Sequence, residues 1–157
     1  MNQTMKTQSI QEKLNQKVSK EDTSTRQGPA GIRLTYLESW KVIQSANQIF
    51  GYNGWSCAII DLSLDFCDEK NGKFHVSYSC VVRVTIKESE TFHEDIGSGT
   101  GDSSNKATAI ESAKKEAVSD ARKRALRIFG DALGNCLYDK NYVKEMKKPP
   151  FVPLIKN

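Results

Sequence analysis

The chain has little of what membrane-spanning or secreted proteins need. None of the apolar runs in its 157 residues approaches the ~18 residues that span a bilayer, so we expect no membrane association. The opening residues, MNQTMKTQSI, contain no apolar stretch that could form the core of a signal peptide. We therefore expect the protein in the cytosol or the nucleus.

Metal-ligating residues are also scarce and scattered. The two histidines, His75 and His93, stand at no ligand spacing from any cysteine. The four cysteines lie far apart without a C-x-x-C pair, at Cys57, Cys67, Cys80 and Cys136. We expect no metal and no cofactor, and we interpret the cysteines as small buried apolar residues.

Motifs for catalysis and nucleotide binding are missing as well. The stretch DIGSGTG at 95–101 is glycine-rich, but it fits neither G-x-G-x-x-G nor G-x-x-x-x-G-K-[ST]. We interpret it as a flexible connection between a strand and a helix. The two histidines have no nucleophile placed by motif and no carboxylate cluster beside them, so we expect no enzyme.

Positive charge, in contrast, is concentrated in one place. Residues 106–129 hold seven Lys or Arg and three acidic residues, a surplus that equals the +4 of the whole chain. Helical spacing puts one apolar arc on this segment: Ile110, Ala113, Ala117, Val118, Ala121, Ala125, Ile128 and Phe129. Four cations fall away from the arc: Lys115, Lys123, Arg124 and Arg127. Such a face suits a polyanion, or else it is simply solvated, with Asp120 pairing with Lys123 or Arg124.

The remaining patterns predict an α+β fold. A capping-box pattern, Thr35-x-x-Glu38, opens a helix with Trp40 on its packed face and Gly51 as its stop. Alternating apolar residues predict strands around 62–66, 74–86 and 91–96, with the middle strand central. The order is thus helix, three-stranded antiparallel meander and long basic helix packed on the sheet, with a last short helix near 139–146.

The ends of the chain are expected to differ from its centre. Residues 1–30 are polar and predicted to be partly disordered, with a short amphipathic helix marked by Ile10, Leu14 and Val18. Residues 31–148 form the predicted core domain, and residues 149–157 form a C-terminal tail.

One aromatic corner stands between the first helix and the first strand. We expect Phe50 and Trp55 to be buried there, with glycines allowing the turn. Tyr52 lies between small turn-forming neighbours, so we expect its ring near the surface, where it can contact a base or a sugar-phosphate.

Long stretches of the chain closely resemble the Rad52 family of single-strand annealing proteins. They are FGYNGWS (50–56), FHVSYSCVVRVTIK (74–87), HEDIGSG (93–99), KKEAVSDARKRALRIFGDALGNCLYDKNYV (114–143) and SIQEKLNQKV (9–18). The resemblance implies a β-β-β-α core, a ring of about ten or eleven subunits, and annealing of complementary DNA strands without ATP or metal during double-strand break repair in the nucleus.

The resemblance also implies two DNA sites. The family's inner groove for single-stranded DNA corresponds to Lys41, Tyr52, Lys115, Lys123, Arg124 and Arg127. A second, outer DNA site corresponds to Lys87, Lys140 and Lys144. We expect single-stranded DNA as the main partner and weaker binding of double-stranded DNA. Relatives carry a long C-terminal tail that binds the recombinase and the single-strand binding protein. We expect these partners only if the natural protein has such a tail.

Two other functions remain open from the residues. One is an oligomeric scaffold or interaction domain whose affinity for nucleic acid is incidental. The other is an RNA-binding β-sheet module, which is disfavoured because the strands lack clustered exposed aromatics of the RNP type.

Overall fold

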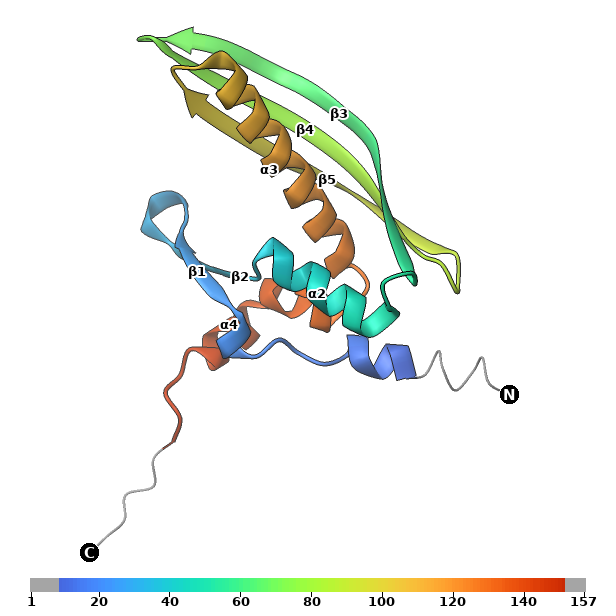
Figure 1. Cartoon of the computed structure of the whole chain (residues 1–157). Helices are drawn as coiled ribbons and strands as arrows, with labels where there is room; N and C mark the ends of the chain where they lie inside the picture. The colour runs from blue at the N-terminus through green and yellow to red at the C-terminus, as the bar shows by residue number, and fades with distance from the viewer. Residues whose placement is uncertain (1–8, 152–157) are drawn as a thin grey trace, which may run out of the picture.

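The structure, a computed structural model that describes residues 9–151, has the α+β architecture expected from the sequence (Figure 1). One long helix covers the concave face of a three-stranded sheet, and the other elements gather around one end of that helix. Residues 9–14 are helical; the elements that follow are η1 (Lys20–Asp22), β1 (Ser24–Gln27), η2 (Pro29–Gly31), β2 (Arg33–Tyr36), α2 (Ser39–Phe50), β3 (Trp55–Lys70), β4 (Lys73–Ile86), β5 (Thr91–Ser103), α3 (Lys106–Arg127), η3 (Asp131–Leu133), η4 (Asn135–Tyr138) and α4 (Lys140–Met146). None of the described helices is long and apolar enough to cross a bilayer.

The central strand of the sheet is β4, as predicted. It pairs antiparallel with β3 on one side and with β5 on the other. Its alternate side chains are buried toward α3: Val76, Cys80, Val82 and Val84 are at most 1% exposed. The period-two pattern in the sequence therefore marks the buried face of this strand.

Helix α3 begins at Asn105, whose side-chain oxygen accepts a hydrogen bond from the backbone N–H of Thr108 at 3.1 Å. Its packed face is a row of alanines four residues apart, each at most 1% exposed: Ala109, Ala113, Ala117, Ala121 and Ala125. The predicted apolar arc is confirmed in its alanines. It is wrong at Ile128, which caps the helix end and is 39% exposed.

The glycine-rich stretch is part of strand β5, so the predicted flexible connection is wrong. Gly97, Gly99 and Gly101 all lie in β5 and alternate with outward-facing residues. A Cβ on Gly97 would stand 2.1 Å from the backbone nitrogen of Ala121, and one on Gly101 would stand 1.9 Å from the Ala109 carbonyl oxygen. These glycines are therefore required by close helix–sheet packing, and the alternation of glycine was itself the strand signal.

Helix α2 begins differently from the predicted capping box. Thr35 lies on strand β2, and Glu38 is the N-cap residue, without a side-chain capping bond. The Glu38 carboxylate instead accepts hydrogen bonds from the Ser24 hydroxyl and from the Trp40 indole N–H. Trp40 is 56% exposed, so its predicted place on the packed face is wrong; Val42 and Ala46 are buried there.

The N-terminal region contains more regular structure than the sequence indicated. Strands β1 and β2 form an antiparallel hairpin that lies on both sides of the predicted boundary between residues 30 and 31. The predicted amphipathic helix is present at residues 9–14, and Leu14 and Val18 are buried in the main core. The described residues of this segment are thus regular in structure, and the partial disorder expected within residues 1–30 stays a prediction. Residues 1–8 lie outside the described residues, as do residues 152–157 of the predicted tail.

The two ends of the described chain are joined through Val18. The hydroxyl of Tyr142, on α4, donates a hydrogen bond to the Val18 carbonyl at 2.5 Å. The Val18 N–H lies 3.5 Å from the sulfur of Cys136. Helix α4 is itself capped by Asp139, whose carboxylate accepts hydrogen bonds from two backbone N–H groups. The last predicted helix is thus confirmed, and it holds the N-terminal segment in place.

The four cysteines differ in their burial. Cys80 and Cys136 are buried as expected. Cys57 is exposed and Cys67 is partly buried, so the expectation was wrong for these two residues of β3. Helix α3 lies mainly over β4 and β5 and leaves the concave side of β3 open.

Candidate nucleic-acid interface

A basic hollow lies between the β1–β2 hairpin, the C-terminal half of α3 and residues 133–138. We call it the hairpin groove; its volume is about 300 Å³. Its polar and aromatic lining consists chiefly of Arg26, Thr35, Tyr36, Asp120, Lys123, Arg124, Arg127 and Tyr138. Four cations face one carboxylate, so this hollow is suited to an anionic ligand.

Lys123 is held in the groove by its neighbours. Its ammonium donates a hydrogen bond to the Leu37 carbonyl at 3.2 Å and lies 5.2 Å from the centre of the Tyr36 ring. Burial lowers the pKa of Lys123, and the nearby charge of Arg26 lowers this pKa further, while Asp120 raises it. A phosphate here would offset both unfavourable effects on the charged form.

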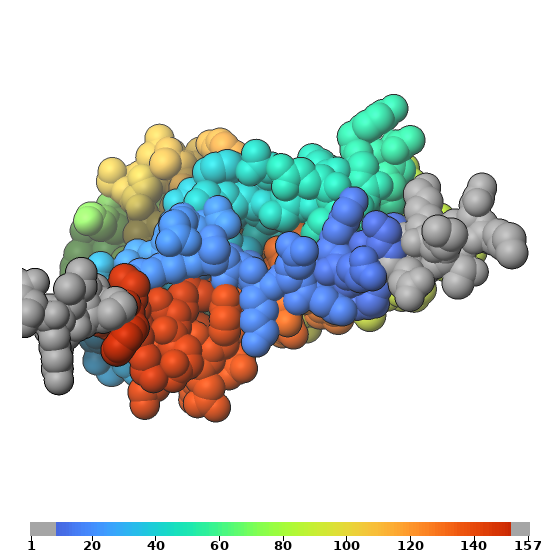
Figure 2. All heavy atoms as spheres, turned by 90° about the horizontal axis from the view of Figure 1, so that it is seen from below, coloured from blue at the N-terminus to red at the C-terminus, as the bar shows by residue number. Residues whose placement is uncertain are grey.

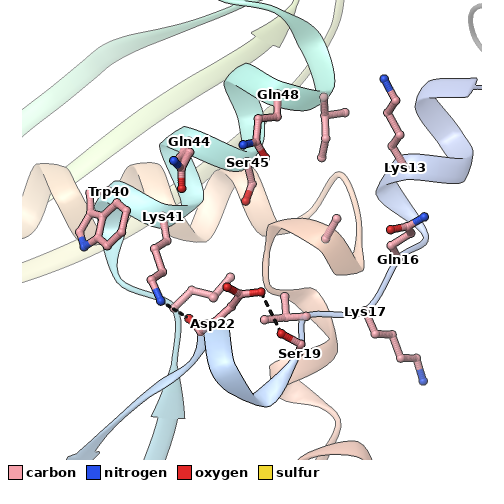
Figure 3. Close-up of a pocket in the computed structure, with 14 residues that line it drawn as sticks. Lys13, Gln16, Lys17, Ser19, Asp22, Trp40, Lys41, Gln44, Ser45 and Gln48 are labelled. Carbon is pink, nitrogen blue, oxygen red and sulfur yellow. Dashed lines mark hydrogen bonds between the residues drawn. The ribbon is translucent and has the colours of Figure 1, made fainter.

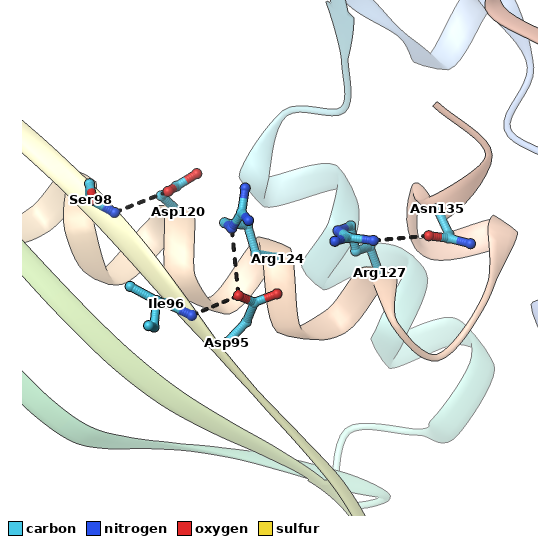
Figure 4. Close-up of polar contacts among 7 residues, drawn as sticks. All are labelled: Asp95, Ile96, Ser98, Asp120, Arg124, Arg127 and Asn135. Atoms are coloured by element: carbon cyan, nitrogen blue, oxygen red, sulfur yellow. Dashed lines mark hydrogen bonds and ion pairs between the residues drawn. The ribbon is translucent and has the colours of Figure 1, made fainter. Parts of the chain in front are cut away.

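Arg127 is fixed by two contacts and keeps one free donor. Its Nη1 donates to the side-chain oxygen of Asn135 at 3.0 Å (Figure 4), and its guanidinium lies 4.1 Å from the centre of the Tyr138 ring. Its Nε is buried and has no hydrogen-bond partner among residues 9–151, and the same is true of the hydroxyl of Thr35. Buried unpaired polar groups are costly, so each of the two would be stabilised by a hydrogen-bond partner.

Arg124 and Asp120 point toward strand β5 (Figure 4). The Arg124 Nε lies 3.7 Å from a carboxylate oxygen of Asp95, and the Asp120 carboxylate accepts the backbone N–H of Ser98 at 3.1 Å. Asp120 is thus bonded to the sheet, while its charge still acts on Lys123 of its own helix.

The structure does not gather all six predicted inner-groove residues in one hollow. Lys123, Arg124 and Arg127 share the hairpin groove. Lys115 lines a separate shallow hollow on α3, with Lys114 and Arg122 among its neighbours, and its ammonium pairs with Glu111.

The other two predicted inner-groove residues lie at opposite ends of α2. Lys41 donates to the Asp22 carbonyl at 3.1 Å and lines a hollow beneath the helix. Tyr52 follows the helix, roughly 15 Å further along its axis. The tyrosine is 87% exposed, so its predicted surface position is confirmed, while Phe50 and Trp55 are partly buried around it.

The three predicted outer-site residues fall in two places. Lys140 and Lys144 lie one turn apart on α4. Lys87 directly follows β4, at the turn into β5, on the other side of the molecule from α4 (Figure 1). Within one subunit they form no common surface.

Sequence reasoning missed the contribution of the hairpin. Arg26, Thr35, Tyr36 and Tyr138 complete the groove, yet none of the four was predicted to line a site, and Thr35 was interpreted as part of a helix cap. Arg26, Thr35 and Tyr36 lie on strands of four residues, which are too short for a periodic pattern to appear. Within residues 9–151 no three His, Cys, Asp or Glu side chains gather where they could hold a metal ion.

Comparison with known proteins places this fold and its basic helix in a family. A profile described as "Rad52/22 family double-strand break repair protein" matches residues 6–151, and the chain belongs to this family. It is 50% identical over 146 residues to the DNA repair and recombination protein rad22 of Schizosaccharomyces pombe, which covers 90% of this chain and 31% of that protein.

Two further relatives are similar to the same degree. The DNA repair and recombination protein RAD52 of Saccharomyces cerevisiae is 50% identical over 145 residues, covering 92% of this chain and 31% of the relative. The DNA repair and recombination protein rti1 of Schizosaccharomyces pombe is 52% identical over 127 residues, covering 80% of this chain and 34% of the relative. The chain thus spans about a third of the length of these relatives.

Proposed function

We propose that this chain binds single-stranded DNA as an oligomeric ring and anneals complementary strands in DNA repair and recombination, without ATP. Membership of the Rad52/22 family supports a role in repair and recombination. The hairpin groove is the observation that carries the DNA-binding part. It joins three cations of one helix to Arg26, and it leaves the Nε of Arg127 buried and unpaired.

Annealing needs no residue that makes or breaks a bond. Two single strands repel each other through their phosphates, and each strand folds on itself when free. Lys123, Arg124 and Arg127 neutralise phosphates and release counterions, which stabilises an extended backbone. Base edges then remain exposed, and Watson–Crick pairing selects the partner strand.

Assembly into a ring explains why the predicted residues lie apart in one subunit. Repetition around a ring of about ten or eleven copies places the hollows of neighbouring subunits in series. Lys41, Tyr52 and Lys115 then extend the track that starts in the hairpin groove. Apolar side chains that are about half exposed on the two edge strands are suited to contacts between copies: Ile59, Ile60, Leu64, Phe66, Phe92 and Ile96.

The remaining parts of the proposal concern location and further partners. Action on chromosomal DNA places the protein in the nucleus. Lys87, Lys140 and Lys144 form the proposed outer site, which also takes double-stranded DNA more weakly, from more than one subunit. Binding of a recombinase and of the single-strand binding protein requires a C-terminal tail beyond the residues described.

The second candidate function is an oligomeric scaffold with incidental affinity for nucleic acid. The half-exposed apolar side chains of β3 and β5 favour it, because they bind protein more readily than DNA. The two functions differ in the rate at which complementary strands pair.

An annealing assay combined with a mass measurement tests the proposal. We expect the purified particle to have the mass of a closed oligomer and to accelerate pairing of complementary oligonucleotides at least tenfold at moderate salt, without ATP. The control is a non-complementary pair, which should bind but not anneal. A particle that binds oligonucleotides without changing the pairing rate would leave only the scaffold function. A lone subunit with no affinity for oligonucleotides would exclude both candidate functions.

The lowered pKa of Lys123 predicts how affinity responds to alkali. Because burial disfavours its ammonium, Lys123 loses its proton at a lower pH than an ordinary lysine. We expect DNA affinity to decline at lower pH in the natural protein than in Lys123→Arg, measured up to about pH 10. The oligonucleotide should contain only adenine and cytosine, since thymine and guanine ionise in alkali. Superimposable profiles would show that Lys123 does not contact phosphate.

Deprotonation of Lys123 should affect the stability of the fold in the opposite direction to its effect on DNA affinity. Between its lowered folded pKa and its ordinary unfolded pKa, the unfolded chain binds more protons at Lys123 than the folded chain. The contribution of Lys123 to the free energy of unfolding therefore rises with pH across this window. Loss of DNA affinity in alkali is thus distinguishable from unfolding.

A further inference from the structure

A second and larger hollow lies between helix α2 and the N-terminal segment (Figure 3). We call it the α2 groove; its volume is about 610 Å³, about twice that of the hairpin groove. Seen from below in Figure 2, the blue N-terminal segment runs between cyan α2 and the orange-red C-terminal elements. One wall of the groove, the N-terminal segment, is held to α4 by the Tyr142–Val18 hydrogen bond.

The charge of the α2 groove is positive. Lys13 and Lys41 line it from opposite sides, and Lys17 stands at its rim with its ammonium 4.7 Å from the centre of the Tyr142 ring. Its acidic member, Asp22, accepts a hydrogen bond from the Ser19 hydroxyl at 2.9 Å. Lys13 and Lys41 inside the groove, against one carboxylate and with Lys17 at the rim, favour an anionic ligand.

The groove also offers groups that can contact a base. Gln44 and Gln48 lie one turn apart on α2 and point into it (Figure 3). Within residues 9–151 their amides make no hydrogen bond, so donors and acceptors are free for a ligand. Trp40 is 56% exposed with its indole N–H held by Glu38, which leaves a fixed aromatic face at the end of the groove.

The two hollows meet at the start of α2. Leu37 lines both of them, and its carbonyl accepts the hydrogen bond of Lys123 from the hairpin groove. Four residues further on, Lys41 lines the α2 groove. The two cationic hollows therefore adjoin at Leu37.

We propose that the α2 groove binds the nucleotides adjacent to those in the hairpin groove, within the same single strand. Lys13 contacts a phosphate, Gln44 and Gln48 hydrogen-bond to bases or sugars, and Trp40 stacks on a base. Cations that follow the backbone, combined with an aromatic platform, are the general means of holding single strands without regard to sequence. This inference rests on the proposed function and adds Lys13, Trp40, Gln44 and Gln48 to the binding surface.

Two substitutions and one fluorescence signal test it with the full chain. Lys13→Ala combined with Gln48→Glu changes two exposed side chains, and we expect it to weaken binding of oligo-dT about tenfold, with a smaller number of nucleotides covered per subunit. Lys20→Ala is the control for the lysine substitution, because Lys20 lies on the same segment but outside the groove, and its effect should stay within about twofold. In a Trp55→Phe background the remaining tryptophan, Trp40, should be quenched by oligo-dT.

The outcomes separate this inference from the proposed function. If Lys123→Ala with Arg127→Ala abolishes binding while Lys13→Ala with Gln48→Glu and the Trp40 signal change nothing, the α2 groove is not part of the DNA path. If the unsubstituted protein binds no oligo-dT, the proposed function itself fails. Quenching of Trp40 by polyglutamate but not by oligo-dT would overturn the inference in favour of an acidic protein partner.

Discussion

Replacing Gly99 by alanine on strand β5 should strongly destabilise the fold. The new Cβ would stand 2.2 Å from the Ala113 carbonyl oxygen and 2.3 Å from the Ala117 backbone nitrogen. Both atoms belong to the backbone of α3, so the helix must move away from the sheet along its length. Overpacking of this kind costs about 3 kcal/mol or more, and Gly99→Val should prevent folding.

Two controls make this result specific to the packing of α3. Ser98→Ala presents a methyl group on the exposed face of the same strand, and its effect should be within about 0.5 kcal/mol. Ala113→Gly should fail to rescue Gly99→Ala, because the clash involves backbone atoms that the second substitution leaves in place. Thermal unfolding and limited proteolysis measure both. A Gly99→Ala protein as stable as Ser98→Ala would contradict the helix–sheet spacing described here.

Removing two cations of the hairpin groove should nearly abolish DNA binding. Lys123→Ala with Arg127→Ala deletes two charged donors per subunit, and we expect affinity for single strands of any sequence to fall by about two orders of magnitude. The plot of log affinity against log salt should become shallower by about 1.4, since each contact to a single strand contributes about 0.7. Fluorescence anisotropy at several salt concentrations gives both quantities.

A charge-matched variant shows whether the loss is local. Lys147→Ala with Lys148→Ala removes the same charge from exposed positions after α4 and should leave the salt dependence nearly unchanged. The mass of the particle and its circular dichroism must be the same in all three proteins. Equal losses in the two double variants would mean that only net charge matters and that the hairpin groove has no special part.

Patterns local in sequence predicted the framework of this fold. The alternation along β4 gave its buried face, with Cys80 and Val82 inside, and the alanine period gave the packed face of α3. Tyr52 was correctly placed at the surface because its turn depends on its immediate neighbours. In each case the periodicity of one element, or the residues of one turn, was enough to predict which side chains are buried and which are exposed.

Features that depend on contacts between distant segments could not be predicted in this way. The glycines of β5 were taken for a loop because the reason for Gly97 is the backbone of Ala121, 24 residues later, on another element. For the same reason, only the α3 side of the groove around Lys123 could be predicted from the sequence. Arg26 and Tyr36 reach it through a hairpin whose strands are too short to show a period.

The hydrogen bond from Tyr142 to Val18 ties helix α4 to the N-terminal segment. Shortening the chain from its C-terminal end therefore has its first structural cost near the opposite end, where residues 13–22 form one wall of the α2 groove. Any process that trims, modifies or binds α4 would act on that wall as well, since the hydrogen bond of the Tyr142 hydroxyl joins α4 to it.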